Sequence, residues 1–507
     1  MYLSEKINFY ILYYKIIFNK DQHLHKYFII FFRKKQDRKE KFMEKSYTEE
    51  EIQILAKSAI GKTFGELSKM KVETISSPDY DKEEEKFNKA FFGHLFETNV
   101  YGYDINSTSA PDFLDAGIEL KVTPYKKNKD NTLSAKERLV LNIINYMDEY
   151  KNEFYSSHFW FKNNKIQIIW YFYEPDKNKN DLRITRELLF SFPKEDLPII
   201  INDWETIIDK IKNGKAHEIS EADTMYLGAC TKGANKNSVR EQPFSTIKAM
   251  QRAFCLKTSY MTGLVRKYIG NYEDVERVLK NVGESFTDFV ENVIKKYKGK
   301  TQKELMEEFN IDSNAKNLNG MLIARMFNVK SRLRDTDEFQ KANIVPRTVR
   351  VEENGHIKES MPFPYFNYES FKTTEWEDSE LKEELETTKY MFFVFKKKDD
   401  DYVFTGIKLW NMPELTLENE VKNMWNKTKN VVLSGNIVKK VDENGKRDTN
   451  FPGMSDNGVC HVRPHARDSK DTLSLPVADK LTGLTEYTKH CFWLNNKYLE
   501  EILKEFI

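Results

Sequence analysis

The second half of this 507-residue chain repeats short motifs of the first half in the same order. Gly61-Lys62-Thr63, followed by Glu66-Leu67, returns as Gly299-Lys300-Thr301, followed by Glu304-Leu305. The matching stretches are 61–67 with 299–305, 89–95 with 316–322, 136–146 with 358–368, and 254–260 with 492–498. Self-similarity that keeps its order indicates a duplicated unit. We therefore predict two homologous domains, 43–270 and 297–507, each long enough for one hydrophobic core.

Two further segments flank or join these domains. Residues 271–296 are predicted to be a helical connector, because Val275, Val278, Leu279 and Val282 recur at helical spacing and Ser285 can cap a second helix that begins at Phe286. Residues 1–42 carry short aromatic and aliphatic patches broken by lysines, in an order that fits neither a signal peptide nor a membrane span. We expect these residues to be a non-native or disordered extension and the natural protein to begin at Met43.

The composition excludes several classes of protein. Lys and Arg number 80 and Asp and Glu number 79, so a histone-like polycation is excluded and any nucleic-acid contact must use locally clustered charge. The longest apolar stretches are too short for a polytopic membrane protein. Four cysteines without zinc-type spacing are typical of small buried side chains in a reducing compartment, so we expect a cytoplasmic protein.

Hydrophobic periodicity predicts an α+β fold, with a central mixed sheet flanked by helices in each domain. In the first domain it predicts helices at 52–60, 87–98 and 204–211, and strands at 118–122, 159–161 and 166–173. In the second domain it predicts strands at 390–395 and 402–409 around a charged hairpin turn.

The stretch from Asp112 to Lys121 carries the residues best suited to chemistry. If 118–122 is a strand, Glu119 and Lys121 project from one face, and Gly117 permits a turn that brings Asp112 beside them. Two carboxylates with the backbone carbonyl of Leu120 offer hard oxygen ligands for Mg²⁺, and a nearby ammonium can orient the attacking water. Glu97, on the preceding helix, can supply a third carboxylate. This grouping predicts phosphodiester hydrolysis.

An exposed salt-bridge face is the ordinary alternative for such a stretch, and the repeat helps to decide between the two. The alignment places Val345 opposite Glu119, Arg347 opposite Lys121 and Ala324 opposite Glu97. The second copy therefore keeps its apolar positions and loses most of the metal-binding set. Loss of a catalytic set from a retained scaffold explains this pattern, so we expect one domain to cut and the other to bind.

Polar loops near the end of each domain are candidates for DNA contact, and that of the first domain is rich in Gly, Ala and Asn. In the first, 228–240, Lys232 and Arg240 suit phosphate or base-edge contacts. In the second, Arg463, His465 and Arg467 form a similar basic loop, for which an ordinary polar loop is the alternative. The basic side chains that follow the first loop can track a duplex backbone: Lys248, Arg252, Lys257, Arg266 and Lys267.

These motifs resemble those of the MutH family of GATC-directed endonucleases, and most closely its two-domain type II restriction endonucleases. The resemblance covers 43–507 and rests on Gly93-His-Leu-Phe-Glu97, Asp112 with Glu119-Leu-Lys121, 136–146, 224–234, 461–467 and 489–496. It implies that Asp112 and Glu119 bind Mg²⁺, that Lys121 acts on the attacking water, and that Glu97 is the acidic residue of the helix. It further implies DNA-reading loops at Thr231-Lys232-Gly233-Ala234 and Arg463-Pro464-His465.

The resemblance also implies a restriction-endonuclease-like core, double-strand cleavage of DNA at GATC within a restriction-modification system, and a second domain that binds another GATC copy as an allosteric effector. The expected partners are double-stranded DNA and, functionally but not physically, a cognate DNA methyltransferase. We expect a monomer in solution that dimerises or loops on DNA, and no membrane association. Two alternatives stay open at this point: a strand-nicking mismatch-repair endonuclease, and a DNA-binding protein that does not cleave.

Overall fold

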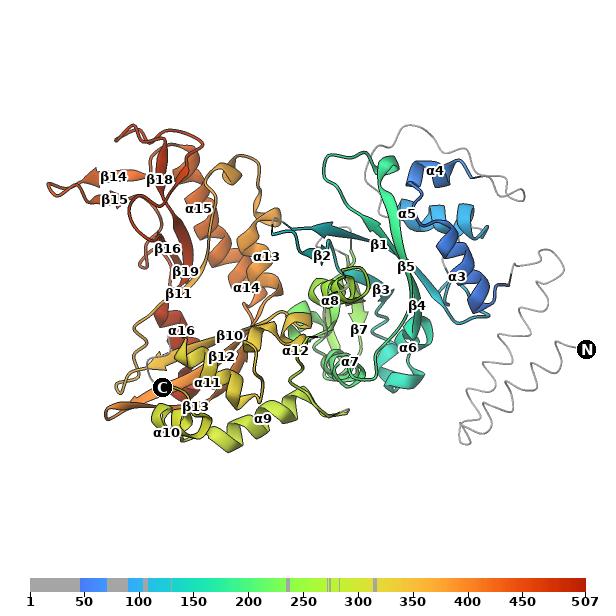
Figure 1. Ribbon diagram of the computed structural model, residues 1–507, viewed down its shortest axis with the longest axis horizontal. Helices are drawn as coiled ribbons and strands as arrows, with labels where there is room; N and C mark the ends of the chain where they lie inside the picture. Colours follow the sequence, from blue (N-terminus) through green and yellow to red (C-terminus); the bar gives the residue numbers. More distant parts are fainter. Residues whose placement is uncertain are drawn as a thin grey trace, which may run out of the picture. The chain divides into compact units, whose positions relative to one another are not determined.

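A computed structural model describes residues 46–70, 90–103, 108–128, 130–233, 238–270, 272, 275–281, 283–312 and 317–507. The chain divides into two units between Ile52 and Gln53, and the elements below lie in the second unit except for the first residues of α3. The structure combines helices with mixed and antiparallel sheets, as the predicted α+β class requires (Figure 1).

In the first half, the strands form two main sheets. The mixed sheet has the order β2-β1-β4-β5, with β1 parallel to β4 and β4 antiparallel to β5. A three-stranded antiparallel sheet has the order β3-β9-β6, and β7 pairs with β8 in a separate hairpin. The bounds are β1 Glu119–Lys127, β2 Leu133–Ala135, β3 Leu139–Ile143, β4 Lys165–Phe172, β5 Arg183–Ser191, β6 Leu227–Thr231, β7 Val239–Gln242, β8 Ser245–Met250 and β9 Arg252–Leu256.

The second half repeats this arrangement. Its mixed sheet β10-β12-β13 again pairs the first two strands in parallel and the last two antiparallel, and its antiparallel sheet has the order β11-β19-β16. Two hairpins complete the set, β14 with β15 and β17 with β18. The bounds are β10 Ile344–Val351, β11 Met361–Tyr365, β12 Lys389–Lys398, β13 Asp401–Trp410, β14 Val438–Val441, β15 Arg447–Thr449, β16 Cys460–Pro464, β17 Thr472–Ser474, β18 Glu486–Thr488 and β19 His490–Leu494.

The repeated Gly-Lys-Thr motif has the same local structure in both halves. Gly61 and Gly299 have left-handed backbones, with φ of +85° and +91°. Thr63 and Thr301 each cap a short helix and form a reciprocal capping box with the glutamate three residues later. The motif therefore fixes a helix start, and its repetition in space supports the sequence alignment of the two halves.

The hydrophobic core does not divide at the predicted domain boundary. One buried cluster includes Trp170 and Tyr260 from the first half together with Phe339 and Phe393 from the second. A second cluster lies wholly within the later residues, from Val345 to Leu503. The division into 43–270, 271–296 and 297–507 stays a prediction, and the shared cluster shows that the two repeats pack as parts of one unit.

The helices have the following bounds: α3 Glu49–Ser58, α4 Phe64–Ser68, α5 Ala90–Leu95, α6 His158–Asn163, α7 Leu197–Lys212, α8 Thr258–Tyr268, α9 Phe286–Tyr297, α10 Gln302–Phe309, α11 Leu318–Met326, α12 Asp337–Lys341, α13 Glu380–Thr387, α14 Glu414–Thr416, α15 Lys422–Leu433 and α16 Asn496–Ile502. The helix predicted over 87–98 is present as α5 and the π-helical turn Phe96–Val100, and its first residues lie outside the described part of the chain. In the residues that the structure describes, no helix combines the length and the apolar character needed to span a bilayer.

The strand predicted at 159–161 was wrong, because these residues belong to helix α6. The Ser157 hydroxyl accepts a hydrogen bond from the Trp160 amide at 3.1 Å and so caps the helix. Phe159 is fully buried in the core, as a strand residue would also be. Of the three residues, only Phe159 is fully buried, whereas Phe161 is 51% exposed. A short apolar run does not by itself distinguish a short helix from a strand.

The first helix predicted in the connector was also wrong, since the described residues from Val275 to Asn281 are not helical. The amides of Val278 and Leu279 donate to the buried carboxylate of Glu338 at 2.8 and 3.2 Å. Amides that bind this carboxylate hold the segment in a non-helical path. The second predicted helix is confirmed as α9, which Ser285 caps.

Candidate active site

Strand β1 holds the central pair of the candidate site. Glu119 and Lys121 lie two residues apart and therefore share one face of the strand, and Lys121 Nζ contacts Glu119 Oε1 at 2.5 Å. Glu119 is 2% exposed, although it carries a carboxylate. β1 pairs with β4 from Glu119 to Tyr125 but with β2 only from Tyr125 onward, so its first residues leave one edge open to other ligands.

Asp112 lies at this open edge. The turn before β1 brings it there: Phe113 and Ile118 exchange backbone hydrogen bonds, and Gly117 adopts a left-handed φ of +66°. Asp112 Oδ2 then accepts a hydrogen bond from the Leu120 amide at 2.8 Å. Because the amide and carbonyl of one strand residue point to the same side, the Leu120 carbonyl also faces this edge.

Glu97 approaches the same place from another element. It lies in the π-helical turn Phe96–Val100 that follows α5, and turns of this kind are frequent at functional sites. Its pKa is raised to about 7, first by burial and then by the negative charges of Asp112 and Glu119. Three carboxylates predicted from the sequence are therefore close enough to affect one another electrostatically.

A second lysine, Lys162, completes the group and was missed by the sequence reasoning. It lies in α6, where its Nζ is 3.5 Å from Glu119 Oε2 and donates to the Ala110 carbonyl at 3.0 Å. It thus contacts both the strand carboxylate and the segment that leads into Asp112. Ser157 is a typical helix-capping residue, and recognising it would have placed Lys162 in a helix. The strand predicted at 159–161 led away from this interpretation.

The charges in this group are not balanced. Glu97, Asp112 and Glu119 face two ammonium groups, those of Lys121 and Lys162. Burial raises the pKa of Glu119, and the charge of Lys121 opposes that shift. Glu119 Oε2 is buried and accepts no hydrogen bond, apart from its longer ion pair with Lys162. A buried carboxylate oxygen with spare lone pairs is the type of group that a divalent cation stabilises.

The residues fit a hard divalent cation that shares its coordination with substrate. Among the described residues, no cluster of three or more Asp, Glu, His or Cys side chains could hold an ion. Mg²⁺ commonly takes only one or two carboxylates and fills its other positions with water and phosphate oxygens. Asp112, Glu119 and the carbonyl of Leu120 match that smaller set.

The second half keeps the strand arrangement of this site but lacks two of its carboxylates, those of Glu97 and Glu119. Asn343, with φ of +50°, occupies the place of Gly117 before β10, and buried Val345 takes the place of Glu119. The parallel registers equate Ile166 with Tyr390, so Glu386 stands where Lys162 stands in the first half. Glu338, aligned with Asp112, bonds to the connector amides and pairs with Arg277 at 3.1 Å. These positions therefore lack the pair of carboxylates that Asp112 and Glu119 supply in the first half.

The predicted DNA-reading loop of the first half begins where β6 ends. Thr231 and Lys232 are exposed and Gly233 is half-buried, whereas Ala234 lies outside the described residues. The Lys232 amide donates to the Gln251 carbonyl at 2.8 Å, which anchors the root of the loop beside β9. Arg240, on strand β7, is exposed.

The corresponding loop of the second half follows β16. Arg463, Pro464, His465 and Arg467 are all exposed. The Arg463 guanidinium lies 4.0 Å from the centre of the Trp493 ring, and the His465 ring is 5.2 Å from it. Arg467 pairs with Asp468 at 3.1 Å. The loop thus presents two cationic or titratable side chains arranged around one aromatic ring.

Two of the basic residues expected to follow a duplex backbone are instead buried. Arg252 is 6% exposed and donates to the Ala229 carbonyl at 2.8 Å. Lys257 is 7% exposed and donates to the Thr224 carbonyl at 2.5 Å. Both side chains stabilise the strand β6 region from inside, so neither can contact DNA phosphates in this structure.

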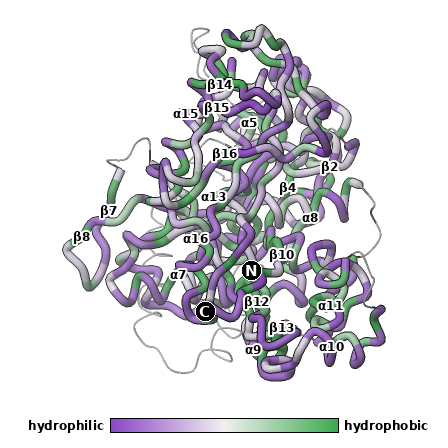
Figure 2. Tube along the Cα trace, turned by 90° about the vertical axis from the view of Figure 1, so that its left-hand side faces the viewer, coloured by the Kyte–Doolittle hydropathy of each residue, from purple (hydrophilic) through white to green (hydrophobic). Residues whose placement is uncertain are grey.

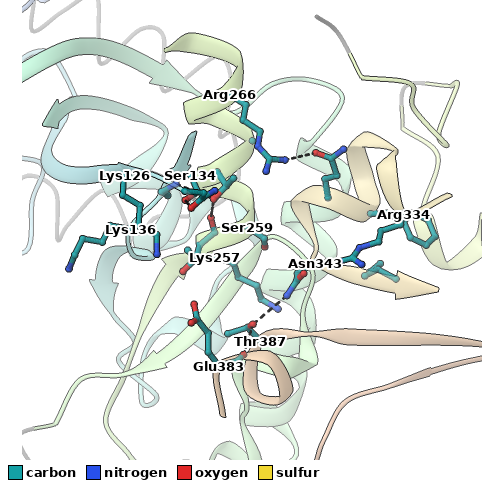
Figure 3. A pocket seen from close by; sticks show the side chains of 18 of the residues that line it. Lys126, Ser134, Lys136, Lys257, Ser259, Arg266, Arg334, Asn343, Glu383 and Thr387 are labelled. Carbon is teal, nitrogen blue, oxygen red and sulfur yellow. Dashed lines mark hydrogen bonds between the residues drawn. The ribbon is translucent and has the colours of Figure 1, made fainter. Parts of the chain in front are cut away.

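A cavity of about 500 Å³ lies between the two halves, beside the start of α8, as Figure 3 shows. Its charged lining is mixed, with Lys126, Lys136, Lys257, Arg266 and Arg334 against Glu221, Asp335, Glu383 and Glu386. None of Glu97, Asp112, Glu119 and Lys121 lines it. The cavity is therefore not part of the candidate active site.

Comparison with known proteins agrees with the geometry. The family described as "DNA mismatch repair enzyme MutH" matches residues 101–203, which contain Asp112, Glu119, Lys121 and Lys162. The type II restriction enzyme Sau3AI of Staphylococcus aureus is 36% identical over 503 residues, covering 92% of this chain and 100% of that enzyme. The DNA mismatch repair protein MutH of Vibrio campbellii is 26% identical over 231 residues, covering 44% of this chain and 96% of its own length. That of Shewanella woodyi is 26% identical over 193 residues, covering 37% and 80%.

Proposed function

This chain belongs to the family of MutH-related type II restriction endonucleases and is a site-specific deoxyribonuclease, and we propose that it makes Mg²⁺-dependent double-strand cuts at GATC. The observation that carries the metal-dependent part is the meeting of Glu97, Asp112 and Glu119 at the open edge of β1, beside two lysines. The choice of GATC rests on the resemblance of the motifs to those of GATC-directed endonucleases. We place the enzyme in the cytoplasm, where a cognate methyltransferase would protect host DNA.

The proposed mechanism assigns a role to each side chain of the group. Asp112, Glu119 and the Leu120 carbonyl would hold the ion, which when bound polarises the scissile phosphate and lowers the pKa of water. Lys121 is positioned by Glu119 to orient the attacking water and to offset the charge that develops on the phosphate. Lys162 holds the segment before Asp112 through the Ala110 carbonyl. Glu97, with a pKa near 7, can accept a proton at neutral pH.

Digestion of unmethylated, GATC-containing supercoiled plasmid with Mg²⁺ tests this function. Double-strand cleavage at GATC produces linear fragments with ends at that sequence. Nicked circles would instead favour the strand-nicking repair activity, and gel retardation without cleavage would favour a DNA-binding protein that does not cut. The last two outcomes, or ends at another sequence, would contradict the proposal.

We also assign the second half a DNA-binding role as an allosteric effector. The repeat retains an exposed loop with Arg463 and His465 but has Val345 in place of the catalytic glutamate. A monomer that engages two sites, by looping or by dimerising on DNA, would then be activated by a second GATC copy.

Plasmids with two GATC sites should therefore be cut faster than plasmids with one, when the site concentration is kept equal. Coupling between two binding sites is typically worth about 1–3 kcal/mol, so a rate difference of roughly 5- to 150-fold is expected. Arg463→Ala should remove most of the difference while leaving one-site cleavage intact. Equal rates on the two plasmids would contradict the effector role.

A further inference from the structure

The turn of hairpin β7–β8 has an aromatic residue, Phe244, at a position that usually takes glycine. Gln242 and Ser245 are paired across the hairpin, so Pro243 and Phe244 alone form the turn. Phe244 has φ of +61°, and a turn with proline first and a positive φ second ordinarily takes glycine or asparagine there. A bulky L side chain in this region of φ is strained.

Burial of the ring does not compensate for this strain. Phe244 is 70% exposed, although its ring makes an edge contact with Tyr150 at 5.5 Å between centroids. Ile247, three residues further along the same hairpin, is 55% exposed. The tip of the hairpin thus presents two large apolar side chains to solvent.

The turn is held firmly in this conformation. Gln242 is buried, accepts a hydrogen bond from the Ala216 amide at 2.7 Å, and donates to the Ile247 carbonyl at 2.5 Å. The Phe244 carbonyl lies so close to Gly214 that a Cβ on that glycine would come within 2.6 Å of it. The residues after α7 therefore form a support that fits this strained turn, which indicates that the presentation of Phe244 is a built feature.

The base of hairpin β7–β8 lies beside the base of the proposed DNA-reading loop. In Figure 2 the hairpin lies at the margin of the trace. Gln251 accepts a hydrogen bond from the Lys232 amide and donates one to the Ser238 carbonyl at 2.9 Å, which joins the two roots. Lys232, Arg240 and Lys248 are exposed around the hairpin, against one exposed acid, Glu241. This excess of positive charge favours a polyanionic partner over an apolar protein surface.

We propose that hairpin β7–β8 is a second DNA-contacting arm and that Phe244 is a wedge, packing against the bases of the duplex beside the recognition site. Aromatic and aliphatic wedges of this kind stack on or between bases and bend the helix. This inference rests on the proposed function, because the wedge has a role only if the chain engages duplex DNA. It explains why a strained and exposed aromatic residue stands where glycine would satisfy the fold.

The test compares Phe244→Gly, which relieves the strain and removes the ring, with Phe244→Tyr, which keeps the ring. Leu415→Ala in α14 is the matched control, since Leu415 is an exposed apolar residue at 76% exposure in the second half. Each variant is made in both the active protein and a Glu119→Gln background. Thermal unfolding, affinity for a GATC duplex by fluorescence anisotropy, and the fluorescence of 2-aminopurine beside the GATC site are measured.

We expect Phe244→Gly to unfold at the same temperature as the parent or higher, and yet to bind the duplex about tenfold more weakly, as loss of one stacking contact implies. The 2-aminopurine signal should rise when the parent and the Phe244→Tyr protein bind, and stay low with Phe244→Gly. Leu415→Ala should match the parent in every measurement.

Unchanged affinity and 2-aminopurine signal in Phe244→Gly, with normal GATC cleavage by the parent, would overturn the wedge and leave the proposed function intact. If Phe244→Gly changes only self-association, measured by size-exclusion chromatography, the tip is a protein contact and the wedge is also refuted. If the parent itself neither binds nor cuts GATC DNA, the result contradicts the proposed function and, with it, the wedge.

Discussion

Glu119→Gln is expected to abolish DNA cleavage while leaving duplex binding largely intact. Glu119 is the buried carboxylate that contacts both lysines of the site, and it is one of the two side chains proposed to hold the ion. Removing its charge should cost several kcal/mol of transition-state stabilisation, a loss of about a thousandfold or more in single-turnover rate. The rate is measured on a labelled GATC duplex, and binding is measured separately by anisotropy.

Glu205→Gln is the matched control for this experiment, because Glu205 is an exposed glutamate on α7. It should cleave at the parent rate. Retention of cleavage in Glu119→Gln would remove Glu119 from the catalytic group. A parallel loss of cleavage and of the folded state, seen by thermal unfolding, would instead assign Glu119 a structural role.

Lys121→Ala should also cause a large loss, about a hundredfold to a thousandfold in cleavage rate, because one preorganised cation opposite developing charge is typically worth that much. Lys162→Ala should lose less, since in this structure Lys162 holds the Ala110 carbonyl and reaches Glu119 only at 3.5 Å. Single-turnover rates and duplex affinities of both variants distinguish the two roles. A larger loss for Lys162→Ala than for Lys121→Ala would reverse their proposed assignment.

Much of the fold could be predicted because it follows from local patterns. The strands at 118–122 and 166–173 were recognised from their apolar runs, and both are present as β1 and β4. The repeated Gly-Lys-Thr motif identified the duplication because a capping box has a fixed sequence form. The first helix of the connector was predicted wrongly for the opposite reason. Its path depends on a hydrogen bond to Glu338, which is distant in the sequence, and no local pattern indicates that contact.

In the candidate site, too, the residues that are close in the sequence could be predicted and the more distant ones could not. Asp112, Glu119 and Lys121 could be predicted because one short turn and one strand bring them together. Lys162 could not, because it reaches Glu119 from helix α6, whose residues 159–161 were predicted to be a strand. Arg252 and Lys257 were misassigned to the surface because charge suggests exposure, whereas these two side chains satisfy buried carbonyl groups.

The placement of the divalent ion in the first half is tested most directly by equilibrium binding of Mn²⁺, followed by electron paramagnetic resonance, in the presence of a GATC duplex. The proposed site predicts that the Glu119→Gln protein loses a bound ion that the parent and the Glu205→Gln control retain, at equal DNA occupancy. The same number and affinity of bound ions in the parent and Glu119→Gln proteins would contradict it.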